Sequence, residues 1–182
     1  MSNFRLFFRY LKCWLLLKYH RLKHVHRTAY IAFGAEVSRD LIAEAFTYVG
    51  KNSMVGPKVS LGAYSMLGPN VLCVGDDHRF DIPAVPCIFS DRPVLRPTKI
   101  GRDVWIGAGA IIMSGVEIGD GAIVAAGSVV TKSIPSCEIH AGIPNRKIKD
   151  RFTTHTEKML HLEEISKPPR QGSYATKHKI IN

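Results

Sequence analysis

The chain has 182 residues, of which 46% are hydrophobic and 22% are charged, and its formal net charge at pH 7 is +10. These values are typical of one globular domain with tails, and they exclude a wholly disordered chain and a multi-span membrane protein. Residues 31–144 carry nine Lys or Arg and eleven Asp or Glu, so the basic excess lies at the two ends. A nucleic-acid-binding core concentrates basic residues in the fold itself, so we expect no nucleic acid partner.

Residues 1–30, the first predicted region, hold seven basic and no acidic residues. At about 100° per residue, residues 4–27 place Phe4 and Trp14 on one side of a helix and Arg9 on the other. Such a basic amphipathic helix is typical of a membrane interface, and it equally suits a cap on the open end of a solenoid. Basic residues interrupt the apolar stretches and no small-residue cleavage site follows, so we expect no signal peptide.

The four cysteines are far apart in the sequence and form no Cys-x-x-Cys pair. A disulfide scaffold needs a denser, shorter chain, so we expect free thiols and a reducing compartment. The protein is therefore expected to be cytoplasmic, with peripheral attachment to the inner face of the membrane through residues 4–27 as an open alternative.

A six-residue period runs through the second predicted region, residues 31–144. Twelve of fourteen residues at this spacing are Val, Ile or Leu. Glycine often follows the aliphatic residue, and a small or β-branched residue stands two positions before it. A β-sandwich would show a period of two, whereas a period of six predicts short strands joined by tight corners and stacked about 4.8 Å apart in parallel sheets. The fourteen positions are Ile31, Val37, Ala43, Val49, Val55, Leu61, Leu67 and Cys73, then Ile100, Ile106, Ile112, Ile118, Val124 and Val130.

The two arrays are out of phase, because Cys73 and Ile100 are separated by 27 residues, which is not a multiple of six. We expect residues 79–99 to leave the coil as an excursion loop, since their four prolines cannot donate ladder hydrogen bonds. A long loop of this kind in a compact domain is usually functional.

The third predicted region, residues 145–182, contains a short amphipathic helix at Thr154–Ile165 and a basic, mobile end. This helix could cap the second open end of the coil, and residues 167–182 are expected to lack regular structure.

The stretch from Ile100 to Arg151 resembles the C-terminal half of the hexapeptide-repeat acetyltransferases, which include the maltose, galactoside, serine and xenobiotic enzymes. The Gly-x-Pro-Ala-Lys tail of that family is present in altered form as Gly142-Ile143-Pro144-Asn145-Arg146. The resemblance covers about residues 31–152. It implies an all-β, left-handed parallel β-helix that uses acetyl-CoA as acyl donor and assembles as a homotrimer.

The family's catalytic histidine lies on or beside the excursion loop, and its match in this sequence is His78. The imidazole would remove the proton of an acceptor hydroxyl, because an unassisted hydroxyl is a poor nucleophile. Asp76, Asp77 and Asp81 are neighbours that could orient His78, with Asp81 as the first choice, although a backbone carbonyl would also serve. The sugar acetyltransferases also use an asparagine upstream, which matches Asn52, a residue type that equally suits a plain corner. The backbone N–H groups of Gly107 and Gly109 are candidate oxyanion donors.

The same resemblance implies a groove for the extended pantetheine arm and a cationic end for the phosphates. Trp105 could instead be a plain outward-facing stacking residue, and the cations could instead belong to a solvated tail. The matching positions are Trp105, Gly107, Ala108, Ala126, Gly127, Lys132, Arg146 and Lys147. No metal is expected. The carbonic anhydrases that share this coil bind zinc through three histidines, whereas the turns of this coil supply only His78.

The acceptor stays open between a hydroxyl of a sugar or glycan intermediate and an antibiotic of the streptogramin or chloramphenicol type. Serine is less suitable, since the large N-terminal helical domain of the serine enzymes is absent. A noncatalytic β-helix adaptor is the alternative from another functional class. We expect a homotrimer with sites at subunit interfaces, because Val85, Ile88, Phe89 and Val94 on the loop need a surface on which to pack.

Overall fold

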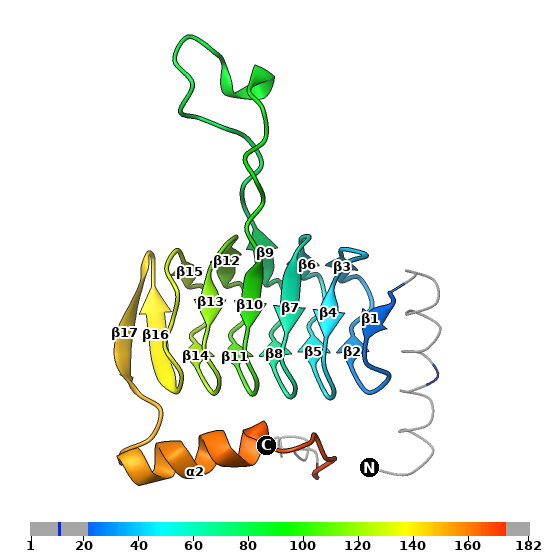
Figure 1. The fold of residues 1–182 in the computed structure, drawn as a ribbon, viewed down its shortest axis with the longest axis vertical. Coiled ribbons are helices and arrows are strands. Elements are labelled where there is room, and N and C mark those ends of the chain that lie inside the picture. The colour runs from blue at the N-terminus through cyan, green and yellow to red at the C-terminus, as the bar shows by residue number, and fades with distance from the viewer. Residues whose placement is uncertain (1–10, 12–21, 174–182) are drawn as a thin grey trace, which may run out of the picture.

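The computed structural model describes residue 11 and residues 22–173, and it shows a coil of three parallel sheets that form the sides of a triangular prism (Figure 1). Sheet A contains β1 (His24–Val25), β4 (Ile42–Ala43), β7 (Val59–Leu61), β10 (Thr98–Ile100) and β13 (Glu117–Ile118). Sheet B contains β2 (Tyr30–Ile31), β5 (Tyr48–Val49), β8 (Met66–Leu67), β11 (Trp105–Ile106), β14 (Ile123–Val124), β16 (Glu138–Gly142) and β17 (Asn145–Asp150). Sheet C contains β3 (Glu36–Val37), β6 (Met54–Val55), β9 (Leu72–Val74), β12 (Ile111–Met113) and β15 (Val129–Val130). The left-handed parallel β-helix is confirmed.

The fourteen residues at the six-residue spacing, which we call the hexad residues, form the core, as the period predicts. All fourteen lie in strands, and thirteen are buried, while Val37 is partly buried against the same cluster. The small residues two positions earlier are buried too, and the polar ones among them bond to nearby backbone: Ser53 Oγ donates to the Gly68 carbonyl at 3.0 Å. Cys73 takes a core position, where burial raises the pKa of its thiol to about 12. One inward side chain per short strand is therefore sufficient to fill the narrow prism.

The excursion loop occupies residues 75–97, between the end of β9 and the start of β10. Ala43 pairs with Leu61, 18 positions later, whereas Leu61 pairs with Ile100, 39 positions later. The loop therefore inserts 21 residues between two turns that stay in register. The loop begins and ends a few residues before the predicted position near 79–99, because Thr98 and Lys99 already pair with β7. The loop stands far out from the prism and carries a 3₁₀ turn, η1 (Cys87–Phe89), near its tip (Figure 1).

The N-terminal helix predicted over residues 4–27 lies mostly outside the described residues. The described end differs from that prediction, because His24 and Val25 form β1 and pair with Ile42 and Ala43 of β4. The ladder bonds of the coil override the helical pattern here, and the coil begins before residue 31.

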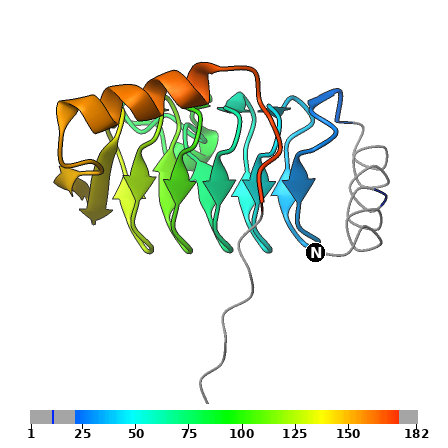
Figure 2. The same ribbon diagram turned by 90° about the horizontal axis from the view of Figure 1, so that it is seen from below.

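The C-terminal part contains two elements. β17 pairs antiparallel with β16, so the predicted boundary between residues 144 and 145 falls inside a hairpin. The predicted helix is present as α2 (His155–Ser166), whose N-cap Thr154 forms a capping box with Glu157. It does not cap the end of the coil but lies along its side, where Arg102 donates to the Ile165 carbonyl at 3.2 Å (Figures 1 and 2). No helix in the described part of the chain is long and apolar enough to span a membrane.

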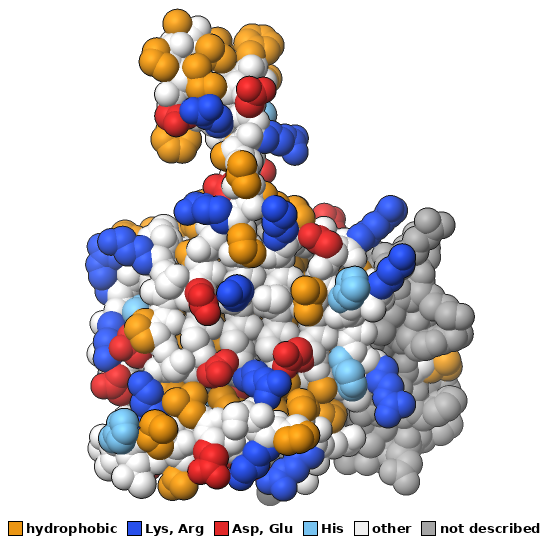
Figure 3. Space-filling model, in the orientation of Figure 1, with side chains coloured by type: hydrophobic (Ala, Val, Ile, Leu, Met, Phe, Trp, Pro, Cys, Tyr) orange, Lys and Arg blue, Asp and Glu red, His pale blue; other side chains and the backbone are white. Residues whose placement is uncertain are grey.

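The outer faces of the three sheets differ in polarity. Sheets B and C expose mainly apolar side chains, whereas sheet A exposes a mixture of charged, polar and apolar groups, and Figure 3 shows that mixed face. The outward residues of sheet B are Tyr30, Tyr48, Met66, Trp105 and Ile123. Those of sheet C are Glu36, Met54, Leu72, Ile111 and Val129, and those of sheet A are His24, Ile42, Ser60, Lys99 and Glu117.

Candidate active site

His78 lies in the first part of the excursion loop, four residues after the end of β9, and its side chain is exposed. Within residues 22–173 no hydrogen bond or ion pair holds its imidazole. The second histidine in the coil region is placed differently. His140 is buried, with Nε2 at 2.8 Å from Glu138 Oε2 and Nδ1 at 3.0 Å from the Asn145 amide nitrogen. Of these two imidazoles, only that of His78 is open to an incoming hydroxyl.

Asp81 is engaged by a neighbour other than His78. Arg79 donates to both carboxylate oxygens of Asp81, from Nε to Oδ1 at 2.9 Å and from Nη2 to Oδ2 at 3.2 Å. The Arg79 hydrogen bonds also lower the pKa of the Asp81 carboxyl. Across the loop, the Arg79 backbone N–H donates to the Asp91 carbonyl at 2.9 Å, and Ser90 Oγ donates to the Arg79 carbonyl at 2.6 Å. The structure therefore gives Asp81 a bracing position on the loop and joins it to His78 by no hydrogen bond among the described residues.

Asn52 occupies a corner between sheets B and C, with a φ of 58°. Its Oδ1 lies 3.1 Å from where a Cβ would stand on Gly34, the equivalent corner one turn earlier. Asparagine tolerates this left-handed backbone better than most residues. The excursion loop leaves from the corner between sheets C and A, so Asn52 and His78 lie at different corners of one chain.

Four of the predicted cofactor residues form one surface at the corner between sheets B and C, which we call the small-residue shelf. It consists of Gly107, Ala108, Ala126 and Gly127 on two successive turns. The turns are in close contact: the Gly127 N–H donates to the Ala108 carbonyl at 2.9 Å, and a Cβ on Gly107 would lie 2.4 Å from Ala126 N. A Cβ on Gly127 would meet nothing within 4 Å, so the outer side of the shelf is open.

Trp105 lies on the outer face of sheet B, two residues before the shelf, and 53% of its surface is exposed. The shelf and the indole together offer a smooth apolar surface for an extended arm. The predicted oxyanion donors are not available there, because the Gly107 N–H donates to the Val124 carbonyl at 2.8 Å and the Gly109 N–H to the Pro69 carbonyl at 2.9 Å. These bonds belong to the ladder that closes each turn.

The three predicted phosphate-binding cations have different surroundings at the C-terminal end of the coil. Lys147 Nζ lies 2.8 Å from Asp150 Oδ1 and 2.9 Å from Glu138 Oε1, and the two carboxylates raise the pKa of its ammonium. Arg146 donates to the Asn145 carbonyl at 2.9 Å. Lys132 follows Thr131, whose backbone N–H lies 3.4 Å from Asn145 Oδ1. The positive charge of Lys147 is thus balanced within the hairpin.

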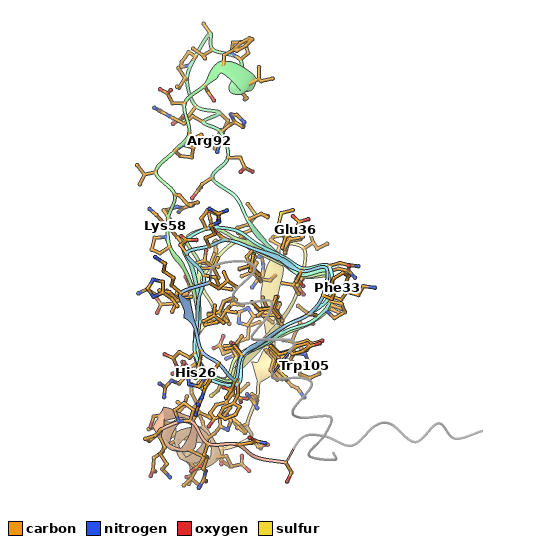
Figure 4. All side chains as sticks on the ribbon, turned by 90° about the vertical axis from the view of Figure 1, so that its right-hand side faces the viewer. His26, Phe33, Glu36, Lys58, Arg92 and Trp105 are labelled. Atoms are coloured by element: carbon orange, nitrogen blue, oxygen red, sulfur yellow. The ribbon has the colours of Figure 1, made fainter. Side chains whose placement is uncertain are left out.

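One chain does not bring His78 and the shelf together. Figure 4 looks along the prism and shows Lys58 at the corner from which the loop rises, with Arg92 out on the loop. In the same view Phe33 marks the corner between sheets B and C, and Trp105 lies on the adjoining face, away from the loop. A reaction that uses both parts therefore needs a second chain.

Two hollows lie elsewhere on the described surface. One of about 370 Å³ crosses the face of sheet A beside Ile42, Lys99 and Glu117, and one of about 250 Å³ lies near the start of α2 beside Cys137 and Lys158. His78 and the shelf line neither of them. Among the described residues, no group of three or more His, Cys, Asp or Glu side chains is placed to hold a metal ion.

Sequence comparisons agree with the coil. Residues 97–132 match the bacterial transferase hexapeptide (six repeats) family. The galactoside O-acetyltransferase of Escherichia coli K12 is 36% identical over 140 residues, which cover 63% of this chain and 69% of that protein. A probable macrolide acetyltransferase of Lysinibacillus sphaericus is 38% identical over 125 residues, covering 60% of this chain and 69% of that protein.

A solved structure supports the fold independently. The maltose O-acetyltransferase of Clostridium difficile 630 superimposes with a TM-score of 0.65 over 82% of this chain and 89% of that chain, at 24% sequence identity. At this identity the similarity concerns the arrangement of the coil.

Proposed function

The chain belongs to the hexapeptide-repeat acetyltransferase family, and we propose that it moves an acetyl group from acetyl-CoA to a hydroxyl of a sugar or glycan intermediate. The observation that carries this proposal is the exposed imidazole of His78 at the point where the coil is interrupted by a loop. A general base must be within hydrogen-bond reach of the proton it removes, and an imidazole titrates near neutral pH.

His78 would act at both ends of the transfer. Its free ring nitrogen accepts the proton of the acceptor hydroxyl while the oxygen forms a bond to the acetyl carbonyl carbon. When the carbon–sulfur bond of the thioester breaks, the imidazolium returns this proton to the departing thiolate, so that His78 ends as it began. General acid–base catalysis of this kind contributes about 10²–10⁴-fold.

The donor would lie along the small-residue shelf beside Trp105. The arm of coenzyme A is extended and carries amides, so it can follow a surface that lacks large side chains. Of the three predicted cations, Arg146 and Lys132 form no ion pair with a carboxylate among the described residues. They are our candidates for the phosphates, with Lys147 placed to keep the hairpin in position.

We propose a homotrimer with one site at each subunit interface. In a cyclic trimer every chain uses two different surfaces, one toward each neighbour. Sheets B and C supply two apolar faces that meet at the shelf, whereas sheet A has the polar face expected of a solvated side. The loop adds exposed apolar groups, with Ile88 74% and Val94 86% exposed in the single chain. A neighbour that covers these surfaces would bring His78 of one chain to the shelf of the next.

The loop also supports the choice of acceptor class. Phe80 and Phe89 offer flat apolar faces and Arg92 offers hydrogen-bond donors, a combination that suits a polar ring. The similarity to the probable macrolide acetyltransferase favours one alternative, acetylation of an antibiotic. We propose a cytoplasmic location, and peripheral contact with the membrane through residues 4–27 would bring the enzyme to a lipid-linked acceptor.

An acceptor screen tests the proposed function. Release of coenzyme A from acetyl-CoA would be followed against sugars, sugar nucleotides, macrolides, chloramphenicol and serine, with the wild-type chain and with His78→Ala. We expect turnover on a sugar class and a loss of about 10²–10⁴-fold in His78→Ala. Turnover on antibiotics alone would select the alternative acceptor. A chain that binds no acetyl-CoA in a stoichiometric assay would be an adaptor and not an enzyme.

A further inference from the structure

The stem of the excursion loop is tied to the coil at Asp76, two residues before His78. The Asp76 carboxylate is only 16% exposed, and its Oδ2 accepts a hydrogen bond from Ser114 Oγ at 2.5 Å. The same oxygen lies 3.4 Å from the backbone nitrogen of Arg96 and 3.5 Å from its Nε. Asp76 is on the outgoing strand of the stem, Arg96 is on the returning strand, and Ser114 follows β12 on the next turn of the coil. One carboxylate therefore joins three segments.

The surroundings of Asp76 leave little room for other arrangements. A Cβ on Gly115 would lie 2.9 Å from the Arg96 side chain, so glycine is needed for Arg96 to lie over this turn. On the other side of the stem, Lys58 Nζ donates to the Leu95 carbonyl at 3.1 Å. Asp76 itself has a φ of 57°, a left-handed conformation that Asp and Asn adopt more readily than other residues with side chains.

The neighbour Asp77 gives a direct comparison. It is exposed and forms no hydrogen bond or ion pair with any residue that the structure describes. The acidic pair Asp76-Asp77 thus consists of one carboxylate that is built into the stem and one that is not.

We propose that Asp76 is a positioning residue for His78. This inference rests on the proposed function, in which His78 is the general base. Because no side chain among the described residues holds the imidazole, its place is set by the backbone of the stem, and Asp76 fixes that backbone two residues away. A catalytic group must be held close to its reactive geometry, and a shift of about 1 Å can cost about 100-fold in rate. The carboxylate accepts charge-assisted hydrogen bonds, which are shorter and stronger than neutral ones.

The test compares Asp76→Ala with Asp77→Ala in steady-state kinetics on the acceptor found by the screen. We expect kcat of Asp76→Ala to fall by about tenfold or more with the KM for acetyl-CoA unchanged, because the shelf lies at another corner. Asp77→Ala should keep kcat within about twofold of wild type, as expected of an exposed residue without partners. Asp76→Asn, which keeps an oxygen acceptor and tolerates the same φ, should recover most of the loss.

Ser114→Ala removes the shortest of these contacts without changing the loop sequence, and it decides the question if Asp76→Ala does not fold. Its kcat should also fall, and the Asp76→Ala, Ser114→Ala double variant should lose little more than Asp76→Ala alone, since both act on one contact. Equal kcat values in Asp76→Ala, Asp77→Ala and Ser114→Ala, with His78→Ala inactive, would overturn this inference and leave the proposed function standing. An active His78→Ala would instead overturn the proposed function.

Discussion

Ile100→Ala is expected to destabilise the coil strongly, and its neighbour Lys99→Ala provides the matched control. The two residues are adjacent on β10, but Ile100 is 2% exposed and contacts the interior, whereas Lys99 lies on the outer face of sheet A. The Ile100 column continues with Leu61 on one side and Ile118 on the other. Every short strand of the prism supplies one such inward side chain, so its removal tests how the core is built.

The magnitude follows from the packing. Ile→Ala removes three carbons, which at about 0.8 kcal/mol each amounts to roughly 2.4 kcal/mol of lost burial. The cavity cannot collapse easily, because the Gly62 N–H donates to the Ile100 carbonyl at 2.7 Å and the Gly101 N–H to the Ile118 carbonyl at 2.8 Å. With the cavity included, we expect a loss of about 3–5 kcal/mol in the free energy of unfolding. For Lys99→Ala we expect a change within about 0.5 kcal/mol.

Urea denaturation followed by far-ultraviolet circular dichroism measures both changes. All samples must have the same protomer concentration, since association contributes to apparent stability. If Ile100→Ala lost no more stability than Lys99→Ala, the hexad side chains would not be the source of the coil's stability, and the account of the core would be refuted.

Three further outcomes follow from the same structure. Gly107→Ala should destabilise the coil by about 1–3 kcal/mol in thermal unfolding, because its Cβ would lie 2.4 Å from Ala126 N. Replacing Arg146 and Lys147 together with Ala should raise the KM for acetyl-CoA with kcat little changed, as steady-state kinetics would show. The Asp76 carboxyl has a pKa below its ordinary value of 3.8, chiefly because the hydroxyl of a serine donates to it. Its contribution to stability is therefore present above pH 3.8 and lost as the pH falls through the lower folded pKa, so Asp76→Asn should flatten the pH dependence of unfolding below about pH 4.

The coil was predictable because its signal is local and repeated. Each hexad fixes its own strand and corner, so fourteen positions read from the sequence all fall in strands. The loop was predictable from the loss of phase between Cys73 and Ile100, although its bounds depend on which residues resume pairing with β7. Thr98 and Lys99 resume it, and Thr98 already fits the repeat as the β-branched residue two positions before Ile100.

The elements that sequence reasoning missed depend on distant partners. β17 has the sequence Asn-Arg-Lys-Ile-Lys-Asp, and five of its six residues are exposed, so no alternation of apolar residues indicates a strand. Its pairing with β16 forms it. β1 has a helical pattern in the sequence but pairs with β4.

The residues of the candidate site were predicted unevenly. The shelf residues do lie together, because they occupy equivalent corners on successive turns. The partner of Asp81 was not predictable, because His78 and Arg79 lie three and two positions before it in the sequence. Only the loop conformation selects Arg79 as the partner. Asp76 and Asp77 are adjacent acidic residues that the sequence alone does not distinguish. The contacts of Asp76 with Ser114, 38 positions later, and with Arg96 distinguish the two in the structure.

We propose that each active site combines His78 of one chain with the shelf of another, and hybrid trimers test this arrangement. Two inactive chains would be mixed, His78→Ala and Ala126→Trp, the second of which places a bulky group on the exposed shelf. In a random mixture about one quarter of the interfaces carry an intact loop from one chain and an intact shelf from the other. We expect the mixture to regain activity up to about that fraction of wild type. A mixture that is shown to contain hybrid trimers and stays as inactive as its parents would show that the active site does not combine His78 and the shelf from two chains.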